Sequence, residues 1–298
     1  MLLSLKMAAL LWITLQICAP VAFGVTAANN PLLWKVTTAS GNAYLLGSIH
    51  FGKQDMYPLD PLIDRAFEDA DALVVEANLL AVPPETLALL LRNKGLYPEG
   101  DNLKANLTPT TWQALEAAVQ RYGIPVAVLQ RQEPWLTALT LSTLAYQHAG
   151  YSEALGIDLH FLHKAQHQKK PIIELESVAT QLSLFDTFTT QEQEAFLLVT
   201  LQELDKGARS LEAIVTAWRE GDANTIDTLF NETLHISPEL ERIYRLLLVD
   251  RNMAMVDKIS QLMQRDTTLF VVVGAGHLVG DKGIVELLKR KGYWVEQL

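Results

Sequence analysis

Short apolar runs of strand length lie near both ends of the chain. Residues 33–37 and 44–46 flank Ser40-Gly41-Asn42, which predicts a β-hairpin with a glycine–asparagine turn. Continuous apolar runs bounded by polar or turn residues are typical of buried strands. The other runs that we interpret as strands are residues 72–76, 171–176, 269–273 and 293–296.

The middle of the chain shows a helical pattern instead. Trp112, Leu115, Val119 and Tyr122 recur at the spacing of one helix face, behind the start signal Thr108-Pro109. Further helices are predicted at residues 84–91, 134–148, 156–168, 178–188, 191–205, 211–220 and 225–231, and outside this region at 61–70, 238–265 and 282–291.

Strands at both ends with helices between them predict an α/β fold. The central sheet is expected to form from the N- and C-terminal strands, and a largely helical insertion of about residues 80–240 to cap one side of it. The chain has 298 residues, of which 49% are hydrophobic, so it is long enough for one large domain or two small ones.

The N-terminus has the pattern of an export signal. Lys6 provides a short positive region, and an apolar stretch follows over residues 7–23. Small residues after it predict a signal peptide at residues 1–24, with cleavage as late as residue 28. The stretch is short and Pro20 interrupts it, which favours a cleaved signal over a lasting anchor. We therefore expect contact with a membrane only through the uncleaved signal segment.

Cysteine content and charge limit the chemistry. The only cysteine, Cys18, lies inside the predicted signal, so the mature protein would have no disulfide and no cysteine nucleophile. Any metal would then be held by His, Asp, Glu or carbonyl oxygen. The net charge is −10 and no basic run occurs, which argues against nucleic acid as a partner.

The pattern Gly-x-x-His occurs twice, at Gly47 to His50 and at Gly274 to His277. Each copy follows an apolar run, and a glycine at the end of a strand lets the backbone turn sharply. The histidines would then stand at the carboxyl edge of the sheet, where open α/β folds keep their sites. Two imidazoles at one edge suit a metal centre or an acid/base centre, whereas a capping or core histidine is the structural alternative.

Carboxylates end two of the predicted strands. Glu76 follows an apolar run, and a carboxylate there is costly unless it is paired or bound to a metal. The structural alternatives for Glu76 are a salt bridge or a contact with a helix N-terminus. Glu174 and Glu176 end the run at 171–176 in the same way, and Glu176 is the stronger candidate since it lies nearer the carboxyl end.

The helix predicted at residues 156–168 carries four polar candidates. Asp158 lies in its first turn, where a carboxylate complements the helix dipole. His160, His163 and His167 share one face at a spacing that could bind zinc. Lysines and glutamines surround the last two histidines, which favours a solvated face for them.

Arg251 lies on an otherwise apolar stripe with Leu247 and Ala254 of the predicted helix at 238–265. A guanidinium in this position is expected to point at a negative group, namely a carboxylate of the protein or of a substrate. We expect Glu76 or Glu176 as the protein partner. The alternative is a surface arginine whose stem lies along the apolar face.

Two common hydrolase signatures do not occur in the chain. It contains neither the Gly-x-Ser-x-Gly elbow of serine hydrolases nor the His-Glu-x-x-His motif of common zinc proteases. Ser48 is a candidate hydroxyl donor and a poor candidate for a nucleophile.

Several short motifs, taken in order, resemble the TraB/PrgY/GumN family, whose members include the TIKI-type metalloproteases. They cover almost the whole mature chain and are Tyr44 to Gly52, Leu73 to Glu76, Tyr97 to Gly100 with Leu103, Pro134-Trp135, Gly156 to Asp158, Lys170 to Ile172, Leu175 to Ser177 with Gln181, Arg251-Asn252 and Gly274 to Gly280.

The resemblance implies a single α/β domain over residues 29–298, similar to erythromycin-esterase and ChaN-like proteins. It also implies a site built from His50, His277 and Glu76. TIKI-type members are manganese- or cobalt-dependent peptidases that act on an extracellular protein, so the resemblance implies a metal-dependent peptidase.

We therefore predict a metal-dependent hydrolase in the periplasm of a Gram-negative bacterium, with a peptide or protein as substrate. Mn²⁺ or Co²⁺ is the expected ion, and Zn²⁺ is a further candidate. The predicted catalytic residues are His50, Glu76, His277 and Arg251, and the predicted metal ligands are His50, Glu76, His277, Glu176 and Asp158.

Two other functions fit the same residues. One is a non-catalytic envelope protein that binds haem, a peptide or a polysaccharide, with the histidines as ligands. The other is an envelope assembly factor in which the His/Glu cluster is only structural. The sequence leaves the oligomeric state open.

Overall fold

The computed structural model of the chain describes residues 31–39, 41–206, 208–234 and 237–298. The predicted signal at residues 1–24 lies outside the described residues. Within the described ranges, no helix is both long enough and apolar enough to cross a membrane.

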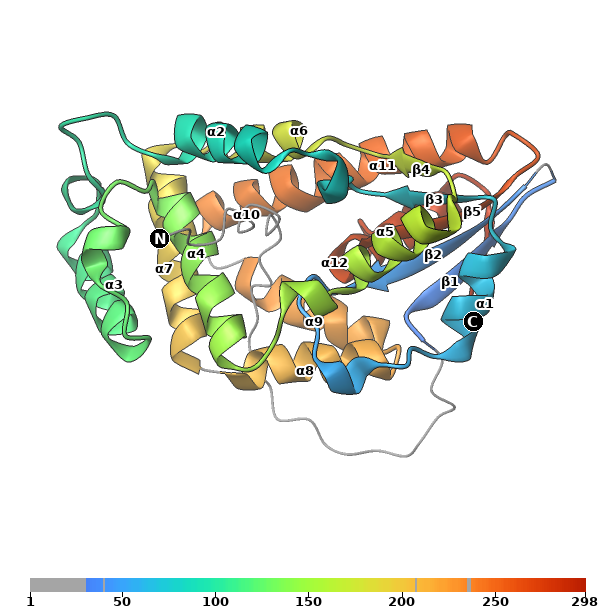
Figure 1. Cartoon of the computed structure of the whole chain (residues 1–298), viewed down its shortest axis with the longest axis horizontal. Helices are drawn as coiled ribbons and strands as arrows, with labels where there is room; N and C mark the ends of the chain where they lie inside the picture. The colour runs from blue at the N-terminus through green and yellow to red at the C-terminus, as the bar shows by residue number, and fades with distance from the viewer. Residues whose placement is uncertain (1–30, 40, 207, 235–236) are drawn as a thin grey trace.

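Six strands of the described chain form one sheet in the order β4-β3-β5-β2-β1-β6 (Figure 1). The strands β2, β5, β3 and β4 run parallel, whereas β1 is antiparallel to both of its neighbours, β2 and β6. The bounds are β1 (Leu33–Thr37), β2 (Asn42–Ser48), β3 (Ala72–Val75), β4 (Ile172–Glu174), β5 (Thr268–Gly274) and β6 (Trp294–Gln297).

The predicted hairpin is confirmed, since β1 and β2 pair from Thr37 and Asn42 onward. The predicted sheet of terminal strands is confirmed as well, with β4 from the middle of the chain added at one edge. The strand predicted at residues 171–176 is shorter than expected, because β4 ends at Glu174. Glu176 therefore lies beyond the strand and is free to turn toward its neighbours.

Helices make up most of the middle of the chain, which confirms an α/β fold with a helical middle. Their bounds are α1 (Pro61–Asp69), α2 (Pro84–Gly95), α3 (Pro109–Arg121), α4 (Pro134–His148), α5 (Ile157–Gln168), α6 (Val178–Phe185), α7 (Thr190–Lys206), α8 (Ala208–Arg219), α9 (Ala223–Leu234), α10 (Pro238–Tyr244), α11 (Asp250–Leu262), α12 (Ala275–Leu278) and α13 (Ile284–Arg290). Short 3₁₀ turns lie at Gln54–Met56, Leu79–Ala81, Leu103–Asn106, Val126–Val128 and Glu153–Leu155.

The central strands β3 and β5 are buried along their length, which shows that both faces of the sheet are covered. Helices α1 and α5 pack on the sheet through a cluster of aromatic rings. The ring centroid of Phe161 lies 5.2 Å from that of Phe67 and 4.8 Å from that of Phe270. Helix α5 therefore belongs to the core of the sheet, although it comes from the middle of the chain.

Helices α8 and α9 also join the core of the sheet, whereas α2, α3, α4, α6 and α7 build a second core. Trp135 of α4 is fully buried and stacks on Phe185 of α6, with the ring centroids 4.7 Å apart. Phe196 of α7 is also fully buried in this cluster. Figure 1 shows α3, α4 and α7 gathered at the end of the molecule away from the sheet. The helical middle thus packs on the sheet through α5, α8 and α9, and its other helices pack largely against one another.

The single helix predicted at residues 238–265 has an interruption. Helix α10 leads into a π-helical turn, Arg245–Val249, and α11 follows directly. The backbone N–H of Asp250 donates to the carbonyl of Arg245, five residues back. A π turn adds one residue to a helical turn and often marks a functional site. Here it lies immediately before Arg251.

Candidate functional site

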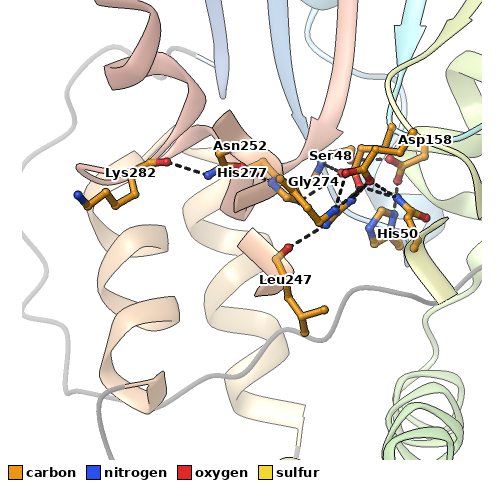
Figure 2. A network of polar contacts seen from close by, with 12 residues as sticks. Ser48, His50, Asp158, Leu247, Asn252, Gly274, His277 and Lys282 are labelled. Atoms are coloured by element: carbon orange, nitrogen blue, oxygen red, sulfur yellow. Dashed lines mark hydrogen bonds and ion pairs between the residues drawn. The ribbon is translucent and has the colours of Figure 1, made fainter. Parts of the chain in front are cut away.

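The carboxyl ends of the parallel strands bring the predicted site residues together. In register, Ser48 pairs with Gly274, and Val75 pairs with both Val272 and Glu174. The residues that follow these strand ends therefore meet at one edge of the sheet, where α/β folds place their sites. Figure 2 shows the resulting network of side chains from β2, α5, α11 and the turn after β5.

The glycines of the two Gly-x-x-His patterns differ in their place in the fold. Gly274 ends β5 and is followed directly by α12, so the turn predicted there is confirmed, whereas Gly47 lies inside β2, which runs on to Ser48. Neither glycine has a positive φ. A Cβ on Gly47 would lie 2.4 Å from Leu32 Cδ2 and 3.2 Å from Ala275 Cα. The copies also lie one residue out of register, since Gly47 pairs with Val273.

His50 is held by a carboxylate on one side only. Its Nδ1 lies 2.7 Å from Asp158 Oδ2, and Ser48 Oγ donates to Asp158 Oδ1 at 2.6 Å. A carboxylate only accepts, so His50 Nδ1 carries a hydrogen. Its other nitrogen, Nε2, is buried and has no hydrogen-bond partner in the described part of the chain. His50 therefore presents one unused nitrogen to the site.

The ion pair shifts the pKa values of His50 and Asp158 in opposite directions. Burial lowers the pKa of His50, but the Asp158 carboxylate outweighs it and raises the pKa to about 9. Burial would raise the pKa of Asp158, yet the charge of His50 and the hydrogen bonds of His50 and Ser48 hold it below its usual value. Asp158 thus orients an imidazole, a role beyond the helix-dipole contact that its position predicts.

Close backbone packing positions Asp158 against His50. The N–H of Ile157, at the start of α5, donates to the carbonyl of Ile49 at 2.9 Å. A Cβ on Gly156 would lie 2.2 Å from the carbonyl oxygen of His50. Only glycine therefore lets the first turn of α5 approach this closely, and that turn carries Asp158.

His277 is held on both sides. Asn252 Nδ2 donates to the carbonyl of Lys282 at 2.8 Å, so the Oδ1 of Asn252 faces His277 Nδ1 and accepts from it. His277 Nε2 then has a lone pair that accepts from Arg251 Nη1 at 3.0 Å. Burial, and then the charge of Arg251, hold the pKa of His277 well below its ordinary value. His277 is thus a neutral imidazole with a fixed tautomer.

Arg251 joins the second histidine to two carboxylates. Its Nη2 donates to Glu76 Oε2 at 2.9 Å, and its Nε donates to both oxygens of Glu176 at 2.9 Å. Its Nη1 also donates to the carbonyl of Leu247, in the π turn, at 2.9 Å. The prediction that Arg251 faces carboxylates is confirmed, and only 4% of its side chain is exposed.

Glu76 is surrounded by donors. Gly274 N donates to its Oε1 at 2.6 Å, and Gln181 Nε2 approaches its Oε2 at 3.3 Å. His277 Nε2 lies 3.8 Å from Oε1. Burial raises the pKa of Glu76 above its ordinary value, although the charges of Arg251 and His50 oppose this. The carboxylate therefore holds a proton more readily than a solvated one.

Other predicted candidates lie apart from this network. Glu174 is exposed and accepts from the backbone N–H of Asn78, so Glu176 is the strand-end carboxylate that reaches the site. His163 and His167 are exposed, as the surrounding lysines and glutamines predict. His160 packs against the ring of Tyr57 instead of joining a metal-binding face.

Two residues of the network, Gln181 and Asn252, occur in the family motifs but were not predicted as site residues. Gln181 donates to Glu76 and also to Glu176 Oε2 at 3.2 Å, and Asn252 fixes His277. The sequence position of each residue could have identified it as a site residue. Gln181 interrupts an apolar stripe of α6, and Asn252 directly follows Arg251, and both are almost fully buried.

The donor types of the site fit a divalent ion, but their spacing does not form a cage. Within the described residues, no group of three or more His, Cys, Asp or Glu side chains lies at a spacing that could hold a metal. The guanidinium of Arg251 lies between His277, Glu76 and Glu176 and supplies the positive charge there. The Nε2 of His50, which has no partner among the described residues, can bind an ion once it has given up the proton that its raised pKa of about 9 retains near neutral pH.

Comparisons with known proteins agree with the resemblance seen in the motifs. The chain is similar to the protein YbaP of Escherichia coli (strain K12), with 29% identity over 254 residues that cover 85% of this chain and 90% of that protein. It is also similar to the zebrafish (Danio rerio) protein Metalloprotease TIKI1, with 25% identity over 314 residues. That match covers 90% of this chain and 63% of TIKI1.

No solved structure matches the chain at a significant level. The model of the TraB/PrgY/gumN family, in contrast, matches residues 32–297, which include every strand and helix of the site. The chain belongs to the TraB/PrgY/gumN family.

Proposed function

We propose that this protein is a metal-dependent hydrolase that cleaves peptide bonds, with Mn²⁺ or Co²⁺ as the preferred ion. The observation that carries the proposal is the buried, unpartnered Nε2 of His50, whose other nitrogen is fixed by Asp158. A histidine backed by a carboxylate in this way is the usual arrangement of a metal ligand. Relatives named as metalloproteases support the same reading.

We assign His50, Glu76 and His277 as the residues that would hold the ion. Asp158 and Glu176 have supporting roles in this assignment, because Asp158 orients His50 and Glu176 holds Arg251. When bound, the ion would polarise the substrate carbonyl and lower the pKa of a water molecule. His277 would bind the ion through Nε2 once the hydrogen bond from Arg251 to that nitrogen is broken.

The protein's own groups supply the proton chemistry. Glu76 is the candidate general base, since a carboxyl whose pKa is raised by burial takes up a proton more readily near neutral pH. Arg251, held by Glu176, is placed to stabilise an oxyanion or to bind a carboxylate of the substrate. Gln181 keeps Glu76 and Glu176 apart in fixed positions.

Metal binding and hydrolysis can be tested on one set of variants. Protein stripped with EDTA is titrated with Mn²⁺, Co²⁺, Zn²⁺ and Mg²⁺ by calorimetry and assayed on a broad peptide mixture. We expect binding of Mn²⁺ or Co²⁺ and peptide cleavage in the wild type, and loss of both in His50→Ala. The matched control is His163→Ala, which removes an exposed histidine and should change neither. Equal behaviour of the two variants would refute the proposal.

We also propose that the protein is exported to the periplasm. The support is the predicted signal at residues 1–24, with its positive start, short apolar stretch and small residues. Expression of the full chain in a Gram-negative host should yield a periplasmic protein whose N-terminal residue, measured by mass spectrometry, is one of residues 25 to 29. A full-length cytoplasmic product would contradict the proposal.

A further inference from the structure

An apolar cavity adjoins the polar network. Its volume is about 70 Å³, and its polar end is formed by the strand-end segments that carry His50 and His277. Most of the rest of its wall is hydrocarbon from helices far apart in the sequence, including Phe196, Leu211 and Ile214, together with the tyrosines Tyr146 and Tyr244. The side chains of Phe196, Leu211 and Ile214 are almost fully buried and come from the two cores, so the cavity lies between them. Its wall also includes the partly exposed residues Tyr146, Phe230, Tyr244 and Leu247.

A space of this kind is costly if nothing fills it. Protein interiors pack as densely as organic crystals, and an apolar void loses the contacts that its wall would otherwise make. Water gains little over most of this space, because a buried water molecule needs two to four polar partners and the wall is mainly apolar away from its polar end. The cavity therefore suits a hydrocarbon group supplied by a ligand.

The boundary between cavity and network is kept clear of side chains. A Cβ on Gly276 would lie 3.0 Å from the ring of Phe230, which forms part of the cavity wall. A Cβ on Gly274 would lie 3.3 Å from Glu76 Oε1 and 3.8 Å from His50 Nε2. Both glycines belong to the second Gly-x-x-His pattern. Because these glycines have no side chains, only backbone lies between the apolar cavity and the Nε2 of His50, which has no partner among the described residues.

We infer that this cavity is the specificity pocket of the site and receives a large apolar side chain next to the bond that is cleaved. The inference rests on the proposed function, because it assigns a peptide substrate to the same site. An aspartate or lysine side chain would lose its hydration in the cavity without gaining a partner. An alanine would leave most of the space empty. Leucine and phenylalanine combine apolar character with enough bulk.

A set of simple peptides tests the preference. Each peptide consists of glycine and serine with one leucine, phenylalanine, alanine or aspartate, and mass spectrometry locates the cleaved bond. With the full chain and Mn²⁺, we expect kcat/KM beside leucine or phenylalanine to exceed that beside alanine by about tenfold or more. We expect no cleavage beside aspartate. Equal cleavage of all four peptides would overturn the inference.

A filled pocket should remove the preference. Ile214→Phe adds bulk to the wall and should lower the leucine-to-alanine ratio of kcat/KM by about tenfold. Leu211→Phe serves as a second variant if the first fails to fold, as judged by circular dichroism. The control is Val128→Phe, since Val128 is 59% exposed and lies outside the cavity wall. An unchanged ratio in a folded pocket variant would contradict the inference.

Binding can be measured without hydrolysis. Xenon, an apolar atom small enough for a cavity of about 70 Å³ and detected by ¹²⁹Xe NMR, should bind at one site in EDTA-treated wild type and Val128→Phe. Binding should be lost in Ile214→Phe. Such binding without any peptide cleavage would refute the proposed hydrolase and leave the cavity as an apolar binding site. No binding to the wild type, or equal binding to all three proteins, would refute the pocket itself.

Discussion

The two Gly-x-x-His segments have the same spacing and end in histidines with opposite surroundings. His50, after β2, has one nitrogen on the carboxylate of Asp158 and one without a partner. His277, after β5, has one nitrogen on Asn252 and the other on the guanidinium of Arg251. The pKa of His50 is raised to about 9, whereas that of His277 is lowered well below its ordinary value.

The difference shows that separate parts of the chain set the position of each histidine at a strand end and its state of charge. The parallel pairing of β2 with β5 brings both histidines to one edge. Their partners come from two helices, α5 for His50 and α11 for His277. His50 therefore holds a proton that it can release, after which its Nε2 can bind a cation, and His277 accepts a hydrogen bond from the arginine of the ion pairs beside it. Four sets of variants can break or sharpen this contrast.

Removal of Arg251 should have the largest effect, on the side of His277. Arg251→Met leaves Glu76 and Glu176 as neighbouring buried carboxylates without their cation. We expect a loss of about 3–5 kcal/mol in the free energy of unfolding, measured with urea in EDTA. Mn²⁺ should recover part of this loss because it can neutralise the same carboxylates. Arg290→Met, at an exposed pair with Glu286, is the control and should cost less than about 0.5 kcal/mol.

His50 should make the metal-free protein less stable as the pH rises. Folding raises its pKa from 6.5 to about 9, so the folded state keeps a proton that the unfolded state loses. This stabilisation is complete below pH 6.5 and is lost as the pH rises through about 9. We expect it to amount to on the order of 3 kcal/mol, measured as the difference between wild type and His50→Gln in urea unfolding at pH 6 to 9.5.

His277 should act in the opposite direction. Folding lowers its pKa, so its contribution is present above pH 6.5 and is lost as the pH falls below that value. The alkaline loss of stability should therefore belong to His50 alone. A constant difference between wild type and His50→Gln across pH 6 to 9.5 would show that His50 does not carry the proton in the fold.

An exchange of the two partners should make each histidine behave more like the other. Asp158→Asn removes the charge that raises the pKa of His50, and the amide oxygen can still accept from Nδ1. We expect the pKa of His50, followed by NMR of the ring protons, to fall by more than about one unit, a change of about 1.4 kcal/mol. Asn252→Asp should raise the pKa of His277. Shifts in the same direction in both variants would mean that charge is not the cause.

The convergence of the site at one sheet edge was predictable from sequence. Continuous apolar runs mark buried parallel strands, and the carboxyl ends of such strands meet at one edge. His50, Glu76 and His277 each follow one of these runs, and the structure brings them together. Local pattern was sufficient here because the position of a residue after a strand does not depend on its distant partners.

The partners themselves were less predictable. Asp158 meets His50 across 108 positions of sequence, and nothing in the spacing of either residue encodes that contact. Arg251 was correctly expected to face carboxylates, yet its exact position depends on the π turn at Arg245–Val249. A single extra residue in a long helix leaves the apolar stripe almost unchanged, so periodicity does not reveal it.

The second core illustrates the same limit at a larger scale. An apolar stripe shows that a helix buries one face, but it does not show what covers that face. The stripe of Leu115 and Val119 on α3 packs into the helical cluster around Trp135 and Phe196. The stripe of α5, around Phe161, packs on the sheet instead. The two helices look alike in sequence and belong to different cores.

The smallest expected effect comes from a change at Ser48. It tests whether Asp158 needs the hydrogen bond from Ser48 in addition to the one from His50. Ser48→Ala removes the hydrogen bond to Asp158 Oδ1 and should cost about 1 kcal/mol of unfolding free energy. The pKa of Asp158 should rise, because one of the donors that lower it is gone. Ser183→Ala is the control, since Ser183 Oγ donates only to a helix carbonyl and alanine favours a helix. If both variants lose the same stability, His50 alone is sufficient to hold Asp158, and the contrast between the two histidines rests on one ion pair.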